Sequence, residues 1–343
     1  MKKFISLFAV IVLLFTGCTN SGTIKGENMK LVKDGKAHYI QLKDIIIDKN
    51  VNLKNTLKKE EFVIESTECK EKMRYIALVP SEFENGKIYP LVIFLHGLRD
   101  TPDNWINDAH IIENYMYEQN NKKIGDMVLI FPESGNEGKS WYADWKKEKE
   151  KNYESFIVKE LIPEVEKRYP CGGSFEKRGI AGFSMGGHGA FKISLKHPEM
   201  FKATGSFAGA LNIYRVSLSN RDGGIFNYIP LPTFIFSKKN ENAQVFMGAF
   251  GTKAKDWKKE NPYNLILEAK KFEKWKDKKY FIDVGEDDEA NYHMTRQWND
   301  IIKRISEEKL DYVSYIVEGQ KHEWSYVELR LPAMLEFMWE NLK

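Results

Sequence analysis

The stretch Arg178-Gly-Ile-Ala-Gly-Phe-Ser-Met-Gly-Gly-His-Gly-Ala-Phe191 decides how this chain folds, because its centre, Gly182-Phe183-Ser184-Met185-Gly186, has the pattern of a nucleophile elbow. In such an elbow a serine occupies a strained turn between a strand and a helix. Glycine two residues before and after the serine keeps a Cβ atom from colliding with the backbone of the turn. A short apolar run precedes Ser184, and a helix-compatible run follows it to residue 196. The alternative interpretation is a glycine-rich turn between a strand and a helix that carries no chemistry.

Strand-like and helix-like runs alternate on both sides of the elbow. Residues 91–95 are continuously apolar, which is typical of a strand buried on both faces of a parallel sheet, and residues 62–67 and 73–79 predict an antiparallel hairpin. Further strands are expected at residues 127–131, 179–181, 203–207, 280–284 and 312–317, and helices at 106–117, 153–169, 185–196, 263–276, 292–308 and 326–341. The alternation predicts one doubly wound α/β domain over residues 60–343, with a mostly parallel sheet covered by helices on both faces.

The first residues have the composition of a targeting segment. A basic start, Met1-Lys2-Lys3, precedes an apolar run over residues 4–15 that is too short for an ordinary membrane span. A small-residue cleavage site follows, so we expect a signal peptide over residues 1–17. Its two lysines leave with it, and the net charge falls from +3 to +1. A nearly neutral body gives no reason to expect a nucleic-acid partner.

The cysteine at that cleavage site makes Phe15-Thr-Gly-Cys18 resemble a bacterial lipobox. Cys18 is then expected to become the lipidated first residue of the mature protein, anchored on the extracellular face of the cell membrane. An ordinary secretory signal, and a secreted protein, is the alternative. Residues 18–59 are polar and rich in lysine, so they are expected to form a tether, with residues 44–48 as a candidate edge strand.

The two remaining cysteines, Cys69 and Cys171, are too few for a disulfide framework and lack the spacing of zinc ligands. They could pair in an oxidising compartment, but the sequence does not place them within bonding distance. No metal or other cofactor is expected.

A serine hydroxyl becomes a strong nucleophile only when a base removes its proton and a third group orients that base. Ligands of an open α/β sheet lie beyond the carboxyl ends of its strands, so both partners should directly follow strands. Of the seven histidines, His322 is the best base, because it follows the last strand and precedes the final helix. His188 competes because it lies close to Ser184, but on the helix after the elbow it should face that helix's packing partners. A histidine that caps or packs against the final helix is the alternative role for His322.

The acid is expected in the loop after the preceding strand, where four carboxylates follow one another: Glu286, Asp287, Asp288 and Glu289. Asp283 lies within the strand itself. An acid-rich helix N-terminus stabilised by the helix dipole is the alternative role for this cluster. A calcium loop is disfavoured because its alternating Asp/Asn ligands and central glycine are missing. The order serine, acid, histidine along the chain is that of α/β-hydrolases.

The oxyanion that forms when Ser184 attacks an ester carbonyl needs two backbone donors. The residue after the nucleophile, Met185, supplies one. We expect the second from Leu98, in the loop that ends the buried strand with His96-Gly97. Glycine at position 97 lets the backbone approach closely.

Seven stretches resemble, in their order, the Putative esterase family of α/β-hydrolases, which includes esterase D (S-formylglutathione hydrolase), tributyrin, feruloyl, acetylxylan and enterochelin esterases and the antigen 85 mycolyltransferases. They are Leu95-His-Gly97, Ser140-Trp-Tyr-Ala-Asp-Trp145, Glu160-Leu-Ile-Pro-Glu-Val-Glu166, Ile180-Ala-Gly-Phe-Ser-Met-Gly-Gly187, Phe250-Gly251 with Asn261-Pro262, Asp283-Val-Gly-Glu-Asp-Asp288 and His322-Glu-Trp324.

The resemblance implies an α/β-hydrolase fold and a Ser184–Asp288–His322 triad, and it selects Asp288 over Asp287. It implies a serine carboxylesterase that hydrolyses short-chain acyl esters, with acetyl or feruloyl groups on carbohydrate as candidates. An acyltransferase, a siderophore esterase and a surface-binding protein without turnover are the alternatives. The segment over residues 211–246 is long and rich in aromatic residues. We expect them to form a lid-like insertion that narrows the acyl pocket, and a satellite core under a long loop is the alternative.

Overall fold

A computed structural model describes residues 57–216, 241–289 and 293–343, together with the backbone of residues 38–40. The expected signal peptide, Cys18, the candidate edge strand at residues 44–48 and most of the aromatic insertion lie outside these residues. Within the described part of the chain, no helix combines the length and apolar character needed to cross a bilayer.

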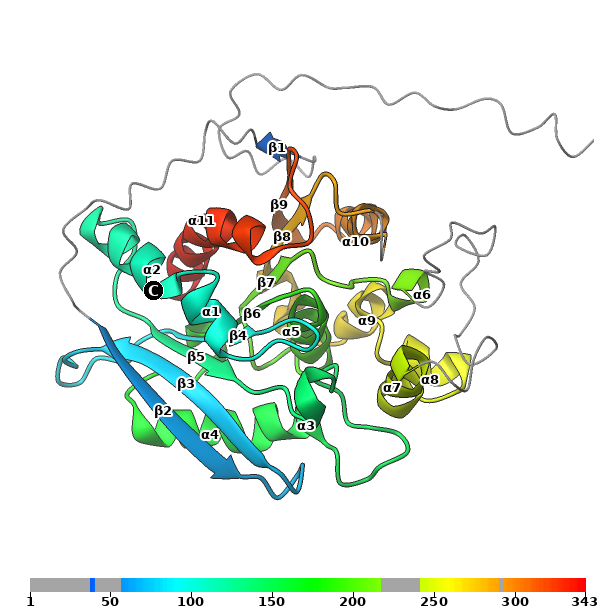
Figure 1. Cartoon of the computed structure of the whole chain (residues 1–343). Helices are drawn as coiled ribbons and strands as arrows, with labels where there is room; N and C mark the ends of the chain where they lie inside the picture. The colour runs from blue at the N-terminus through cyan, green and yellow to red at the C-terminus, as the bar shows by residue number, and fades with distance from the viewer. Residues whose placement is uncertain (1–37, 41–56, 217–240, 290–292) are drawn as a thin grey trace, which may run out of the picture. The chain divides into compact units, whose positions relative to one another are not determined.

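The described strands form one nine-stranded sheet in the order β1-β9-β8-β7-β6-β4-β5-β3-β2 (Figure 1). All neighbours pair in parallel except β2 with β3 and β3 with β5. The strands are β1 (His38–Ile40), β2 (Leu57–Glu65), β3 (Lys72–Pro80), β4 (Leu91–Leu95), β5 (Val128–Pro132), β6 (Arg178–Phe183), β7 (Ala203–Phe207), β8 (Lys279–Gly285) and β9 (Asp311–Val317). The expected mostly parallel sheet is confirmed.

The central strands of the sheet are more completely buried than the edge strand β2, as their sequences suggest. The five residues of β4 are all buried, as are those of β5 and β7, because helices cover both faces. Strand β2 lies at an edge, and its residues alternate between exposed and partly buried. It begins at Leu57, so the expected tether boundary at residue 59 is wrong by a few residues. His38, expected in the tether, lies in β1 beside β9.

The helices follow the strands in the expected alternation. They are α1 (Asp103–Asn107), α2 (Ile111–Asn120), α3 (Tyr153–Ser155), the π-helical segment η4 (Phe156–Leu161), α4 (Ile162–Arg168), α5 (Met185–Lys196), α6 (Ile213–Val216), α7 (Glu241–Phe250), α8 (Ala254–Lys258), α9 (Pro262–Ala269), α10 (Met294–Glu307) and α11 (Trp324–Leu342). Short 3₁₀ turns are η3 (Asn136–Gly138), η5 (Phe175–Lys177) and η8 (Glu273–Asp277).

Three helices depart from expectation. The helix expected at residues 106–117 is two helices, because His110 adopts a left-handed conformation with φ of 46° between α1 and α2. The helix expected at residues 153–169 contains the π-helical segment η4. The helix expected at residues 263–276 ends at Ala269 and is followed by η8. Hydrophobic spacing predicts such helices well, but it carries no signal for a local change of winding.

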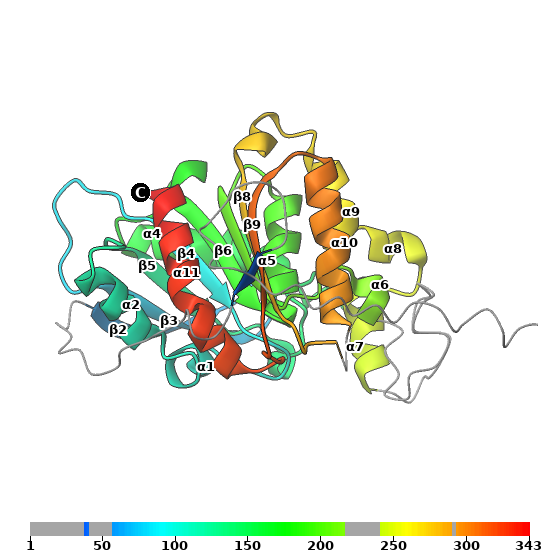
Figure 2. The same ribbon diagram turned by 90° about the horizontal axis from the view of Figure 1, so that it is seen from above.

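Helices pack on both faces of the sheet (Figures 1 and 2). Helix α11 packs against α2 and across β6, β7 and β8, whereas α5 packs against β4, β6 and β7 and contacts α9, which in turn contacts α10. Because α5 begins where β6 ends, its N-terminus lies at the carboxyl edge of the parallel strands.

Cys69 and Cys171 are free thiols, and both are buried. Burial raises the pKa of each thiol to about 12, so neither is a reactive thiolate at neutral pH. The pairing that the sequence allowed does not occur.

Candidate active site

Ser184 lies at the turn between β6 and α5, with φ of 55° and ψ of −116°. This strained conformation is uncommon for a residue with a side chain, and it marks functional sites. Close backbone approaches explain the two glycines. A Cβ atom on Gly182 would lie 2.3 Å from the carbonyl carbon of Gly186, and one on Gly186 would lie 2.0 Å from the Leu95 carbonyl oxygen at the end of β4. The expected nucleophile elbow is present.

His322 and Asp288 approach this elbow from neighbouring strands. Asp288 follows β8, and His322 follows β9, so both lie at the edge where the parallel strands end. The His322 Nε2 atom is 2.7 Å from the Ser184 Oγ atom, and its Nδ1 atom is 2.7 Å from Asp288 Oδ2. A carboxylate only accepts hydrogen bonds, so Nδ1–H donates to Asp288, and Nε2 is left to accept the serine hydroxyl. This arrangement can move the hydroxyl proton to the imidazole as the oxygen attacks an electrophile.

The structure also separates Asp288 from the other acids of its loop. Asp288 is buried, whereas Glu286 and Asp287 are exposed. Glu289 is turned away to form contacts with His293 Nδ1 at 2.9 Å and Arg296 Nε at 2.6 Å. The direction of the backbone in this loop therefore brings one of the four carboxylates, that of Asp288, to His322.

Asp283, within β8, has a different surrounding. It is buried against Arg330 of α11, whose Nε atom donates to its Oδ2 atom at 2.6 Å. Burial raises the pKa of the Asp283 carboxyl to about 6, although Arg330 opposes that shift. This pair holds α11 against the sheet and does not contact Ser184.

The competing histidines also have other roles. His188 is buried on α5, where its Nδ1 atom is 3.0 Å from the Ala210 carbonyl oxygen and its ring lies edge-on to Trp141. Burial, reinforced by the charge of Lys192, lowers the pKa of His188 to about 3. His293, expected inside a helix, instead precedes α10 with φ of 54°. The expectation that His188 faces the packing partners of its helix is confirmed.

His96 orients the loop that contains Leu98. Its Nδ1 atom is 2.9 Å from the Gly97 carbonyl oxygen, and its Nε2 atom accepts the Ser134 N–H at 3.1 Å. Burial lowers the pKa of His96 to about 4, which keeps the ring neutral and able to do both. In a trans peptide the C=O and N–H groups point in opposite directions. Since His96 holds the Gly97 carbonyl, the N–H of Leu98 in the same peptide group points away from the His96 ring.

The described residues enclose a cavity of about 310 Å³ over Ser184. Leu98, Met185 and His322 line it, so both expected oxyanion donors border the same cavity as the serine. Aromatic side chains form much of its wall: Trp141, Phe183, Phe246 and Trp324. The mouth also carries charge, from Arg99, Asp100 and Glu323.

Sequence reasoning did not identify several residues that line this cavity, among them Trp141 and Asp100. Trp141 was only part of a motif shared with the family, and Asp100 was not considered. Asp100 accepts a hydrogen bond from Trp324 Nε1 at 3.2 Å, and burial raises the pKa of its carboxyl. The signal for Trp141 was its place in Ser140-Trp-Tyr-Ala-Asp-Trp145, but nothing local to that motif indicates which tryptophan faces the cavity. Phe246 was expected in the insertion, and it does line the cavity.

In the ranges that the structure describes, no three His, Cys, Asp or Glu side chains are grouped as metal ligands would be. The polar groups around Ser184 are instead arranged for hydrogen bonding, with a hydroxyl, an imidazole and a carboxylate in sequence.

The chain is similar in sequence to known proteins. The model of the family described as "Putative esterase" matches residues 66–338. The chain is 26% identical over 288 residues to the S-formylglutathione hydrolase of Bos taurus, covering 78% of this chain and 88% of that protein. It is 24% identical over 244 residues to the acetyl esterase of Caldicellulosiruptor saccharolyticus, covering 71% of this chain and 81% of that protein.

The fold has solved counterparts as well. A ferulic acid esterase superposes with a TM-score of 0.65 at 21% identity, over 85% of this chain and 100% of that chain. At this level of identity the likeness concerns the fold, which is that of the α/β-hydrolases. The chain therefore belongs to the Putative esterase family and is a serine esterase of the carboxylic ester hydrolase class.

Proposed function

We propose that this serine esterase hydrolyses short-chain acyl esters through an acyl-enzyme, with Ser184 as nucleophile, His322 as general base and acid, and Asp288 as the group that orients His322. One observation carries the proposal: Ser184 Oγ, His322 and Asp288 form a continuous chain of two hydrogen bonds, each 2.7 Å long.

Each step of the reaction uses that chain. His322 Nε2 takes the Ser184 proton as the oxygen attacks the ester carbonyl, and the resulting imidazolium returns a proton to the leaving alcohol. Water, activated by the same nitrogen, then releases the acyl group from Ser184. Asp288, which is buried, stabilises the imidazolium throughout.

The negative charge on the carbonyl oxygen is stabilised by the backbone N–H groups of Leu98 and Met185. Met185 is the first residue of α5, so its N–H is one of the unpaired donors at a helix N-terminus. Leu98 supplies the second donor because His96 fixes the neighbouring carbonyl in the opposite direction.

The cavity supports a small and largely apolar acyl group. A volume of about 310 Å³ lies at the lower end of the range for ligand sites. Trp141 and Phe246 supply flat apolar walls for an acetyl, butyryl or feruloyl group. Two proteins similar to this chain are an acetyl esterase and a ferulic acid esterase, and their names fit esters of this kind. Carbohydrate is a candidate for the alcohol part of the ester.

The proposed site of action is outside the cell. The basic start, the apolar run and Cys18 support a lipoprotein anchored on the extracellular face of the membrane, with secretion as the alternative.

The test is hydrolysis of p-nitrophenyl esters of two to eight acyl carbons by the mature protein, together with labelling by a fluorophosphonate. The wild type should prefer the short esters and be labelled once. Ser184→Ala should lose the label and retain only the roughly 10³–10⁴-fold residual rate over water that remains when a triad member is removed. Asp287→Asn, in an exposed neighbour of Asp288, is the matched control and should keep both properties. Full labelling of Ser184→Ala would exclude this mechanism.

A further inference from the structure

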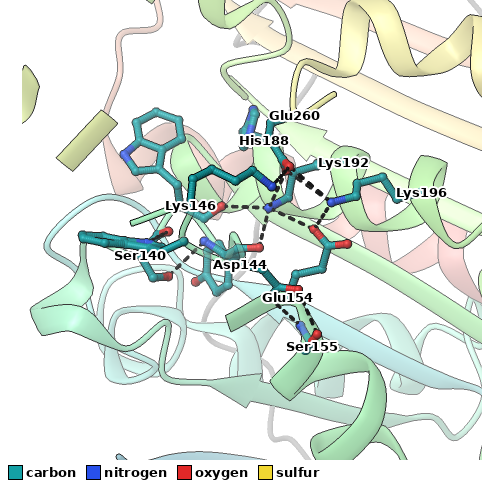
Figure 3. Close-up of polar contacts among 12 residues, drawn as sticks. Ser140, Asp144, Lys146, Glu154, Ser155, His188, Lys192, Lys196 and Glu260 are labelled. Carbon is teal, nitrogen blue, oxygen red and sulfur yellow. Dashed lines mark hydrogen bonds and ion pairs between the residues drawn. The ribbon is translucent and has the colours of Figure 1, made fainter. Parts of the chain in front are cut away.

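A cluster of charged side chains surrounds Lys192 and Lys196, in the C-terminal half of α5 (Figure 3). Lys192, in the middle of that cluster, is completely buried. Its Nζ atom is 3.3 Å from Glu154 Oε2 and 3.8 Å from Glu260 Oε2. Lys196, one turn later on α5, contacts the same two carboxylates at 2.8 and 3.3 Å. The two lysines therefore share their anionic partners.

Lys192 differs from Lys196 in what else it holds. Its ammonium group donates to the backbone carbonyl of Tyr142 at 2.5 Å and lies 3.4 Å from that of Trp141. With Glu154, these carbonyls give acceptors for all three of its N–H groups. No bond from Lys196 to either carbonyl occurs among the described residues.

Those two carbonyls belong to an unusual piece of backbone. Trp141 has φ of 58° and Tyr142 has φ of 48°, so two consecutive large residues adopt the left-handed conformation. This conformation is strained for a residue with a side chain and persists only where the surroundings hold it. Ser140 Oγ accepts the Tyr142 N–H at 2.9 Å, and Lys192 holds the carbonyl side.

This backbone connects to the active site in two directions. The Trp141 ring lines the cavity over Ser184 and packs against Phe246 with ring centroids 4.8 Å apart. The Tyr142 hydroxyl donates to the carbonyl of His96 at 3.1 Å, at the start of the loop that contains Leu98. Trp141 therefore shapes the wall for the acyl group, and Tyr142 supports the loop of the proposed oxyanion donor.

We propose that Lys192 is a positioning residue for substrate selection: its ammonium group holds the left-handed Trp141–Tyr142 pair and thereby keeps the Trp141 ring in the wall of the acyl cavity. The inference rests on the function proposed above and specifies how its pocket is shaped. Without this donor the two carbonyls would lose the hydrogen-bond partner that they have among the described residues, and a buried carbonyl without a partner is unfavourable. The backbone would then relax toward ordinary φ values and move Trp141.

The experiment compares Lys192→Met with Lys196→Met. The control removes an ammonium from the same helix and the same carboxylates, but not from the two carbonyls. Ester hydrolysis is measured over acyl chains of two to eight carbons, with thermal unfolding of each variant alongside. We expect Lys192→Met to lower kcat/KM for the best ester by roughly 10- to 100-fold, since small displacements of a site have effects of that order. It should also shift the preference toward longer chains, while Lys196→Met keeps the wild-type ratios.

Four further variants keep the result decisive. Lys192→Gln retains an N–H donor without the charge, so it should preserve more of the wild-type preference than Lys192→Met. If Lys192→Met does not fold, Lys192→Met with Glu260→Gln removes a charge of each sign, and its chain-length profile is measured in its place. Trp141→Ala should shift the profile by itself, and adding Lys192→Met to it should change the profile little further.

Identical profiles for Lys192→Met and Lys196→Met, or equal effects of methionine and glutamine at position 192, would overturn the inference and leave Lys192 as a partner of the buried carboxylates only. Failure of the proposed function would look different, because hydrolysis would then survive Ser184→Ala.

Discussion

His188 makes the clearest quantitative prediction, because its imidazole is buried beside the proposed active site and stays neutral at pH values where an unfolded histidine is protonated. Its Nδ1–H donates to the Ala210 carbonyl, and its Nε2 atom has no hydrogen-bond partner among the described residues. A second proton on Nε2 would therefore be a buried charge without an acceptor, close to Lys192. Burial and that lysine lower the pKa of His188 from 6.5 to about 3.

The direction in which stability changes with pH follows from proton binding. Between pH 6.5 and pH 3 the unfolded imidazole binds a proton and the folded one does not, so stability falls as the pH falls through this range. At about 1.4 kcal/mol per pH unit, His188 alone should remove about 3 kcal/mol of unfolding free energy between pH 6.5 and pH 4. That is a large part of the ~5–15 kcal/mol typical of a folded domain.

The assay is urea unfolding at several pH values from 7 to 4, for the wild type and His188→Asn. Asparagine keeps a side-chain N–H near the position of Nδ1 but does not titrate. It leaves a smaller side chain and lowers stability at every pH, so the readout is the dependence on pH and not the absolute value. His96, whose pKa is lowered to about 4, contributes equally to both proteins. The wild type should lose about 3 kcal/mol more than His188→Asn over this range, and parallel curves would refute a buried neutral His188.

Three further predictions concern acids, a buried ion pair and the N-terminus. Asp288→Asn should lower kcat by several powers of ten, because His322 loses the group that orients it, and the thermal midpoint should change little. A larger loss of kcat in Asp287→Asn would show that Asp287, and not Asp288, orients His322. Arg330→Met should lower the urea-unfolding free energy by about 3–5 kcal/mol, because it leaves the Asp283 carboxyl buried without its partner, while kcat per folded molecule stays at the wild-type value; an unchanged midpoint would mean that the pair does not stabilise the fold. Cys18→Ser should release the protein from the membrane fraction or leave it unprocessed, and wild-type protein recovered from the medium with an unmodified Cys18 thiol would show that there is no anchor.

The elements of the fold could be predicted where the pattern is local. Strand β4 has the expected bounds, Leu91–Leu95, and α5 has the expected bounds, Met185–Lys196, because an apolar run and a helical run with a stop signal are contained in a few consecutive residues. The left-handed His110 between α1 and α2 was not predictable, because positive φ is uncommon for residues other than glycine and no residue pattern marks this position. Contacts from elsewhere in the chain accompany it, such as that of its Nδ1 atom with Glu328 of α11 at 3.2 Å.

The candidate site was predictable to the level of its segments. Parallel strands end at one edge of a sheet, so the loops after β6, β8 and β9 had to meet there, with a serine, a group of acids and a histidine. Reasoning from the residues alone left four acids open in the second loop, and the family resemblance selected Asp288. The structure brings Asp288 to His322 because it is buried in the turn after β8.

By itself, then, the sequence determined the order of strands and helices, the elbow around Ser184 and the loops that meet beside it, because each depends on residues close together in the chain. Only the tertiary structure decided which carboxylate contacts His322, that Trp141 and Tyr142 take a left-handed conformation, and that Lys192 lies beneath them. Lys192 and Tyr142 are 50 residues apart. A strained backbone and a buried ammonium are each unfavourable alone and depend on contacts with residues distant in the chain, so no local pattern predicts either one.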